Sequence, residues 1–217
     1  MTKTKRLKII LDLIKNEDVV VDIGADHGHL DYYIIKEGLA KKVIATDISA
    51  KSINKTEKMA QFYQISDKIE CRVGDGFNPI KKDETKLVII AGMGGKEISK
   101  IISSSERVYA SQRFILQPAK YGEELRKFLS DHDFNIIYDE CVFENGKYYD
   151  TMYVVKGNKV YKPEEIWFGI TNLNKMSRDF LMRIRDMKVR MEKRINYLTS
   201  CEKSKLDAIN KILNLGE

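Results

Sequence analysis

The stretch Val19-Val20-Val21-Asp22-Ile23-Gly24-Ala25-Asp26-His27-Gly28 decides the fold of this chain. Its β-branched first half is typical of a buried strand, and the glycines that follow let the backbone approach a ligand closely. The dinucleotide fingerprint Gly-x-Gly-x-x-Gly is not met, because Ala25 and Asp26 follow Gly24 and no glycine lies three residues beyond Gly28. The stretch therefore predicts a strand and a ligand-binding turn, and a dinucleotide oxidoreductase is the weakest hypothesis for it.

Further short apolar or β-branched runs follow, and segments with helical periodicity separate them. Strands are expected over residues 42–47, 69–73, 87–91 and 113–116, and helices over residues 7–14, 52–63, 96–103 and 122–129. Such alternation is typical of βαβ units, whose strands are parallel. Two more strands, joined at the hairpin signal Asn145-Gly146, are expected at the end of this region. The sequence predicts an α/β fold with a doubly wound, Rossmann-like, mostly parallel sheet and an antiparallel closing strand.

Gly157-Asn158-Lys159 marks the expected end of the sheet. Beyond it the pattern is helical, with a break near residues 199–203, and apolar residues recur at spacings of three, four and seven. We expect a sheet domain over residues 1–157 and a coiled-coil-like helical hairpin over residues 158–217.

The net charge of +6 is concentrated in this second domain. Residues 1–156 hold 25 basic and 24 acidic side chains, whereas residues 157–217 hold 13 and 8. A helix over residues 173–194 carries most of the excess, which indicates an anionic partner, although a solvated helix face is the plain alternative. The candidate phosphate-binding residues are Lys175, Arg178, Arg183, Arg185, Lys188 and Arg190.

Composition excludes several classes of protein. The chain has 217 residues, of which 43% are hydrophobic and 32% charged, so it can form a core and is not intrinsically disordered. No apolar run approaches the roughly 20 residues of a membrane span. Asp12 interrupts the apolar stretch of the basic amino terminus, so we expect no secretory signal and a cytoplasmic protein. The three cysteines, Cys71, Cys141 and Cys201, match neither a disulfide framework nor a metal site, and no metal is expected.

The residues after each expected strand hold the candidate site, because parallel sheets bind ligands at the carboxyl ends of their strands. Asp47 follows the second strand, 23 residues after Gly24, which suits hydrogen bonds to ribose hydroxyls; the alternative is a helix N-cap. Asp75-Gly76 follows the third strand. After the fourth, Gly92-Met93-Gly94-Gly95 forms a flat backbone surface, and the fifth ends at Gln117.

The acid two residues before Gly24 resembles the first motif of Rossmann-like methyltransferases. S-adenosylmethionine carries a sulfonium, an ammonium and ribose hydroxyls, and so suits a pocket lined with carboxylates better than a pyrophosphate does. The predicted cofactor-binding residues are Asp22, Gly24, Asp26, His27, Gly28, Asp47, Ile48, Asp75, Gly76, Ala91, Gly92, Met93, Gly94 and Gln117.

Together these motifs resemble the bacterial TrmK-type tRNA methyltransferases. The resemblance runs from Lys5-Arg6-Leu7 through Asp22-Ile23-Gly24 and Gly92-Met93-Gly94-Gly95 to Leu116-Gln117-Pro118 and the helical appendage. The first motif of that family typically reads Asp-Ile-Gly-Ser-Asp-His-Ala-Tyr-Leu-Pro. This chain departs from it at Ala25, Gly28, His29 and Asp31.

The resemblance implies a class I methyltransferase that uses S-adenosylmethionine to methylate N1 of adenine 22 in the D-arm of tRNA. N1 has an in-plane lone pair and needs no strong base, whereas the product is cationic. Asp26 is therefore the expected charge-stabilising residue. His27 is expected to orient Asp26 or to bind cofactor. Gly92 and Met93 complete the expected catalytic set.

Two other functions remain open at this point. One is a methyltransferase that acts on a small molecule or a protein, with the helical hairpin used for dimerisation. The other is a non-catalytic RNA-binding module with a vestigial S-adenosylmethionine pocket. The expected partner is tRNA rather than a membrane, and a monomer is favoured over an obligate oligomer.

Overall fold

In the computed structural model, which describes residues 3–103 and 113–215, the stretch Glu17–Ile23 forms strand β1 near the centre of a seven-stranded sheet. The other strands are β2 (Ala40–Asp47), β3 (Ile69–Val73), β4 (Leu87–Ala91), β5 (Arg113–Gln117), β6 (Phe134–Glu144) and β7 (Lys147–Lys156). Their order across the sheet is β3-β2-β1-β4-β5-β7-β6. The order reverses between β1 and β4, which is where open α/β sheets form their ligand crevice.

The predicted mixture of parallel and antiparallel strands is confirmed. Strands β1 to β5 pair in parallel, whereas β7 pairs antiparallel with both β5 and β6. Asn145 and Gly146 turn the β6–β7 hairpin with φ values of 48° and 76°. Two successive positive φ values are typical of the type I′ turn that Asn-Gly favours.

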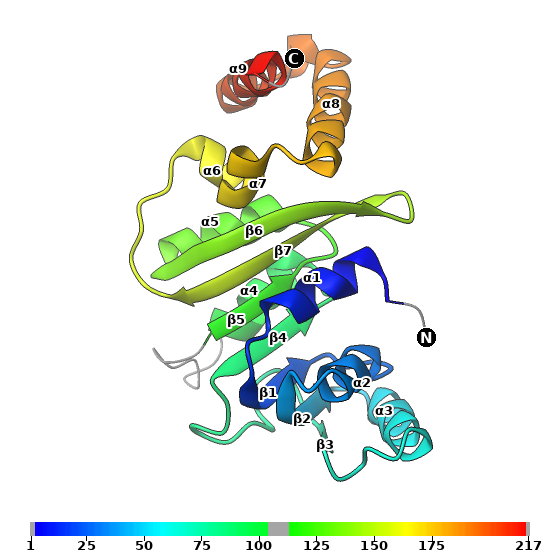
Figure 1. Ribbon diagram of the computed structural model, residues 1–217. Helices are drawn as coiled ribbons and strands as arrows, with labels where there is room; N and C mark the ends of the chain where they lie inside the picture. The colour runs from blue at the N-terminus through cyan, green and yellow to red at the C-terminus, as the bar shows by residue number, and fades with distance from the viewer. Residues whose placement is uncertain (1–2, 104–112, 216–217) are drawn as a thin grey trace.

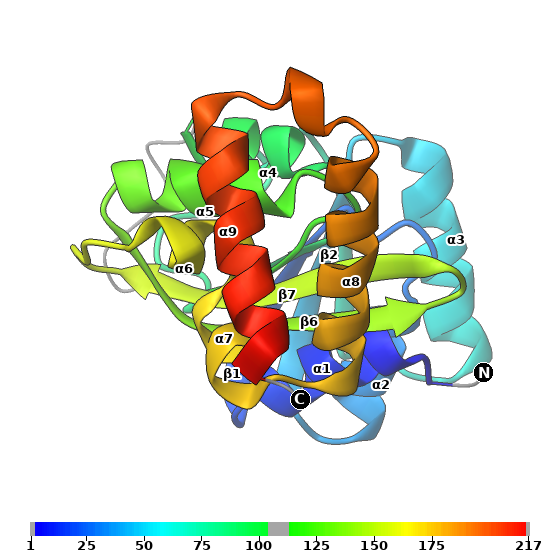
Figure 2. The same ribbon diagram turned by 90° about the horizontal axis from the view of Figure 1, so that it is seen from above.

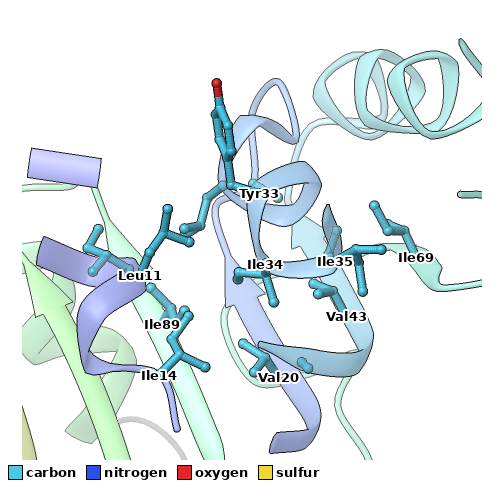
Figure 3. Close-up of a cluster of buried hydrophobic side chains, with 14 of the residues drawn as sticks. Leu11, Ile14, Val20, Tyr33, Ile34, Ile35, Val43, Ile69 and Ile89 are labelled. Atoms are coloured by element: carbon cyan, nitrogen blue, oxygen red, sulfur yellow. The ribbon is translucent and has the colours of Figure 1, made fainter. Parts of the chain in front are cut away.

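Helices cover both faces of the sheet (Figure 1). The helices α1 (Lys5–Leu13), α2 (His29–Lys36) and α3 (Ala50–Phe62) lie on one face, and α4 (Gly95–Ser103) and α5 (Gly122–Asp131) lie on the other. Figure 3 shows the apolar cluster of the first face, where Leu11 of α1 and Ile34 of α2 approach Val20 of β1 and Ile89 of β4. The sheet is thus the middle layer of three.

The C-terminal helices form a separate layer above β6 and β7 (Figure 1). They are α6 (Pro163–Phe168), α7 (Ile170–Lys175), α8 (Arg178–Glu192), the 3-10 helix η1 (Ile195–Tyr197) and α9 (Ser200–Leu215). Helices α8 and α9 pack side by side (Figure 2) around a hydrophobic cluster that includes Phe168, Phe180 and Ile209. Because this cluster is distinct from those of the sheet, we retain the division at residues 157/158 as a proposal.

The expected single helix over residues 173–194 is wrong. Met176 has a φ of 47°, which ends α7, and Ser177 begins α8 by accepting a hydrogen bond from the Phe180 amide at 3.3 Å. The break before the last helix also lies earlier than expected, over residues 193–199. A serine just before an apolar-periodic segment is an N-cap signal, which helical periodicity alone does not reveal.

A buried ion network joins α8 to the sheet domain. Arg126 of α5 lies 2.5 Å from Asp139 of β6 and 3.0 Å from Asp150 of β7, and Arg183 of α8 lies 2.5 Å from Asp150. Burial alone would raise the pKa of Asp150, but the guanidinium groups of Arg126 and Arg183 lower it to about 2. Arg183 is therefore a structural partner of Asp150, and we remove it from the residues predicted to bind RNA.

The described residues contain neither a membrane-spanning helix nor a cluster of metal-binding side chains. No helix among residues 3–103 and 113–215 is both long and apolar enough to cross a membrane. In the same ranges, no group of three or more His, Cys, Asp or Glu side chains is placed to hold a metal ion.

Candidate active site

The carboxyl ends of β1, β2, β3 and β4 meet around a cavity of about 360 Å³, which we call the acidic cavity. Its size lies in the range of small-molecule sites. The residues that line it are Ile23, Gly24, Asp47, Ile48, Gly74, Asp75, Gly76, Met93, Glu97, Lys100 and Ile101. Six of the residues predicted to bind cofactor are among them: Gly24, Asp47, Ile48, Asp75, Gly76 and Met93.

Asp47 is not the N-cap of α3, which was the alternative considered for it. Ser49 caps that helix by accepting a hydrogen bond from the Ser52 amide at 3.3 Å, and Asp47 accepts one from the Ser49 amide at 2.7 Å. This short turn fixes the Asp47 carboxylate at the cavity wall.

Gly24 has a φ of +88° and lies directly under the Met93 side chain, whose Cε would collide with any β-carbon at residue 24. The backbone conformation therefore favours glycine here, and any β-carbon would also force the flexible end of the Met93 side chain to move. Met93 brings the turn after β4 over the turn after β1 and forms part of the cavity wall.

A second cavity, of about 290 Å³, lies beside the first and beneath α1; we call it the α1 cavity. It is lined by Thr4, Arg6, Leu7, Ile10, Asp26, His29, Leu30, Tyr33, Ala91, Gly92 and Gln117. The turn after β1 supplies Gly24 to the acidic cavity and Asp26 to this one, and the turn after β4 supplies Met93 and Gly92 in the same way. Two adjoining chambers therefore share the same two turns.

Asp26 presents an ionised carboxylate to the α1 cavity. Its oxygens lie 3.4 Å from Lys55 Nζ and 3.4 Å from His27 Nε2, and Ser52 Oγ donates to it at 3.3 Å. Slight burial acts to raise the pKa of Asp26, but Lys55, His27 and Ser52 outweigh it and lower the pKa. The side chain is 62% exposed, so a ligand in the cavity can reach it.

His29, the first residue of α2, also lines the α1 cavity. Partial burial and the nearby His27 lower its pKa, so the imidazole is neutral at pH 7. The His27 and His29 rings are 5.7 Å apart. The cavity thus combines the Asp26 carboxylate and the Arg6 guanidinium with the rings of His29 and Tyr33.

His27, Gly28 and Gly94, which were predicted to bind cofactor, line neither cavity, and Gln117 is engaged elsewhere. His27 lies at the surface beside Lys55, at 3.3 Å between Nε2 and Nζ, and Gly28 is pressed against Thr56 and Met59 of α3. Gly94 is buried. The amide of Gln117 lines the α1 cavity, but its Nε2 donates to Thr151 Oγ1 at 2.7 Å and to the Arg6 carbonyl at 3.0 Å.

Asp22 also lies outside both cavities and faces Asp31 of α2 instead. The two carboxyl groups are buried together and influence each other's ionisation, and no N–H or hydroxyl in the described chain reaches either oxygen of Asp31. Burial, followed by Asp47, raises the pKa of Asp22 to about 7, and burial together with Asp22 also raises the pKa of Asp31 well above its usual range. The raised pKa values therefore favour a protonated pair below about pH 7.

Replacing Asp31 by asparagine is expected to remove a pH dependence of stability. A carboxyl group with a raised pKa stabilises the fold below pH 4, and this contribution is lost as the pH rises through about 7. The amide of the new asparagine could donate to an ionised Asp22, so Asp31→Asn should raise the free energy of unfolding by about 2 kcal/mol at pH 8 and much less at pH 5.

Urea titrations at both pH values measure this difference, and Asp12→Asn, at an exposed acid of α1, is the matched control. An equal change in the free energy of unfolding at pH 5 and pH 8 would contradict the raised pKa values of this pair.

The sequence did not reveal which helices border the cavities. Glu97, Lys100 and Ile101 come from α4, and Thr4 and Arg6 lie at the start of α1. Glu97 anchors its turn by accepting a hydrogen bond from the Gly94 amide at 2.7 Å. The polar face of an amphipathic helix is visible in a sequence, but the cavity that the face borders depends on tertiary packing.

Known proteins match this chain closely. The family described as a methyltransferase domain matches residues 3–152. The tRNA (adenine(22)-N(1))-methyltransferase of Bacillus subtilis is 30% identical over 157 residues, which cover 72% of this chain and 66% of that protein. A candidate tRNA methyltransferase of Mycoplasma genitalium is 33% identical over 162 residues, which cover 73% of this chain and 72% of that one.

A solved structure agrees with these relatives. The crystal structure of a candidate tRNA (m1A22) methyltransferase of Streptococcus pneumoniae, in complex with S-adenosyl-L-methionine, has a TM-score of 0.88 and 25% identity to this chain. The superposition covers 98% of this chain and 100% of the other. The chain therefore belongs to the methyltransferase domain family and, within it, to the TrmK-type tRNA methyltransferases.

Proposed function

We propose that this protein uses S-adenosylmethionine to methylate N1 of adenine 22 in tRNA. The observation that carries this proposal is the pair of adjoining cavities, one lined by Asp47 and Asp75 and the other by Asp26 and His29. Relatives with the tRNA (m1A22) activity in their names, one of them bound to S-adenosylmethionine, support it.

The donors of the acidic cavity fit the cofactor. Asp47 would accept hydrogen bonds from the ribose hydroxyls and Asp75 one from the adenine amine, while Gly24 leaves room for the methionine part. Carboxylates at this edge also favour a sulfonium cation over an anionic dinucleotide. Bound there, S-adenosylmethionine supplies an electrophilic methyl group.

The α1 cavity fits the target base. N1 lies on the Watson–Crick edge of adenine, so the base must leave its stack and enter a pocket before methylation. The ionised Asp26 stabilises positive charge as it develops on the ring. A neutral His29 offers a face for stacking without repelling the cationic product.

We propose that the exposed face of α8 contacts tRNA phosphates. Arg178, Arg185 and Arg190 are exposed there, and Lys188 pairs with Glu192 at 3.8 Å. Lys175 of α7 pairs with Glu140 at 3.0 Å and is only partly available. We further propose that the protein acts as a monomer in the cytoplasm, where tRNA is the substrate.

Reversing the charge of Arg178, Arg185 and Arg190 to glutamate is expected to raise the KM for tRNA at least about ten-fold. Phosphate contacts depend on salt, so the variant should also lose part of the salt dependence of tRNA binding. The Kd for S-adenosylmethionine should not change.

Steady-state kinetics at two salt concentrations, with calorimetry of cofactor binding, measure these effects. Replacing Lys51, Lys58 and Lys68 by glutamate controls for the change in net charge. Unchanged tRNA kinetics in the arginine variant would remove α8 from the RNA-binding surface.

Mapping methylated adenines after incubation with tRNA and labelled S-adenosylmethionine tests the function itself. We expect a single 1-methyladenine at position 22. Methyl transfer to a protein or metabolite extract but not to tRNA would favour a methyltransferase that acts on a small molecule or a protein. Failure to bind the cofactor would favour a non-catalytic RNA-binding module.

A further inference from the structure

The turns after β4 and β5 are joined into one rigid unit next to both cavities. The Gly92 amide donates to the Gln117 carbonyl at 2.9 Å, the Ala119 amide to the Met93 carbonyl at 2.8 Å, and the Gly95 amide to the Lys120 carbonyl at 2.8 Å. A β-carbon at Gly95 would collide with the Tyr121 carbonyl. Residues 118–121 are therefore fixed relative to Gly92 and Met93, which border the two cavities.

Tyr121 occupies this turn in an unfavourable backbone conformation. It precedes α5 with a φ of 62°. Within the described ranges, seven non-glycine residues have a positive φ, and five of them are Asn, Asp or Gln. The other two are Tyr121 and Met176, the residue that ends α7. A bulky aromatic residue in the left-handed region carries strain that points to a functional role.

The Tyr121 ring is not used for core packing. The residue is 43% exposed and belongs to none of the three hydrophobic clusters. Lys96 Nζ of α4 lies 4.9 Å from its ring centroid and Lys120 Nζ lies 5.3 Å from it. Two cations thus lie over the ring of one partly exposed tyrosine.

Some of the acidic side chains on the neighbouring helices already have hydrogen-bond or ion-pair partners. Glu97 accepts a hydrogen bond from the Gly94 amide and Glu123 pairs with Lys205, whereas Glu124 is exposed on α5. Among residues 3–103 and 113–215, no carboxylate lies within ion-pair distance of Lys96 or Lys120. The turn therefore offers an aromatic ring and two ammonium groups to a ligand that carries both a ring and negative charge.

We propose that Tyr121, Lys96 and Lys120 bind a tRNA nucleotide that neighbours the target adenine, with its base stacked on the ring and its phosphate between the lysines. Base–aromatic stacking beside basic side chains is how proteins hold unpaired strands. A neighbour of an adenine that has left its stack loses a stacking partner, and Tyr121 replaces it. This inference rests on the proposed function, because it assigns a second contact to the same RNA.

Tyr121→Asn removes the ring while keeping a residue type that tolerates a positive φ. We expect about a ten-fold rise in the KM for tRNA, with an unchanged Kd for S-adenosylmethionine and a melting temperature no lower than that of the wild type, because asparagine relieves the backbone strain. Tyr121→Phe keeps the ring and should retain the wild-type KM. The double variant Lys96→Ala/Lys120→Ala should lower the salt dependence of tRNA binding.

Phe62→Asn, at an exposed aromatic residue of α3, is the matched control and should leave the KM unchanged. A wild-type KM for tRNA in Tyr121→Asn would overturn the inference. An equal rise in KM in Tyr121→Phe would also overturn it, as would a rise in KM accompanied by weaker binding of S-adenosylmethionine. Absence of tRNA methylation by the wild-type protein would instead refute the proposed function, so the two failures are distinguishable.

Discussion

Replacing Asp26 by alanine is expected to lower kcat for tRNA methylation by about 10²- to 10³-fold, the usual cost of removing one group placed where charge develops. The carboxylate lines the α1 cavity and its pKa is lowered, so it is ionised when the adenine ring gains positive charge. The acidic cavity does not include Asp26, and the Kd for S-adenosylmethionine should therefore change little. Single-turnover kinetics and calorimetry separate the two effects.

Asp18→Ala is the matched control for this variant. Asp18 is an exposed acid at the opposite end of β1 and pairs with Lys41 at 2.7 Å, much as Asp26 pairs with Lys55. Its loss should leave kcat unchanged. A wild-type kcat in Asp26→Ala would show that another group stabilises the positive charge on the adenine ring. A loss of cofactor affinity as large as the loss of kcat would place Asp26 in the cofactor site.

The sequence predicted the framework because each strand is a short apolar run bounded by turn residues. The bounds of β3 and β4 match the predicted runs, and the turn at Asn145-Gly146 forms as expected. The convergence of Asp47 and Asp75 on one cavity was also predictable, since parallel strands bring their carboxyl ends to one edge.

The partners of individual polar side chains could not be predicted in the same way. Asp22 has the expected position at the end of β1, but it turns toward Asp31, which a helix brings against the strand. Arg183 belongs to a basic run, yet it pairs with Asp150 in a strand 33 residues earlier. Sequence periodicity identifies the buried face of an element but not which buried charges will meet, because their pairing depends on tertiary structure.

Asp150→Ala is expected to cost about 3–5 kcal/mol in the free energy of unfolding, a large share of the stability of a typical domain. Asp150 is 4% exposed and serves both Arg126 and Arg183. Without it, Asp139 alone would balance two guanidinium groups, one of them fully buried. Urea denaturation followed by circular dichroism measures the loss.

The fluorescence of Trp167, the only tryptophan, reports on the helical appendage, because its side chain packs against the hydrophobic cluster of α8 and α9. Arg183 links α8 to β7, so the fluorescence transition should shift at least as far as the circular dichroism transition in Asp150→Ala. Asp186→Ala is the matched control. Asp186 also joins α8 to β7, through the Tyr148 hydroxyl at 2.7 Å, but at an exposed site, and should cost under about 1 kcal/mol.

The pH dependence of Asp150→Ala distinguishes loss of the charge from loss of packing. An acid whose pKa is lowered to about 2 stabilises the fold above pH 4, and that contribution disappears as the pH falls from about 4 toward 2. The difference in stability between wild type and Asp150→Ala should therefore be full at pH 7 and shrink below pH 4. A difference that stays constant down to pH 2 would show that Asp150 stabilises the fold by packing, and that the buried arginines do not require its charge.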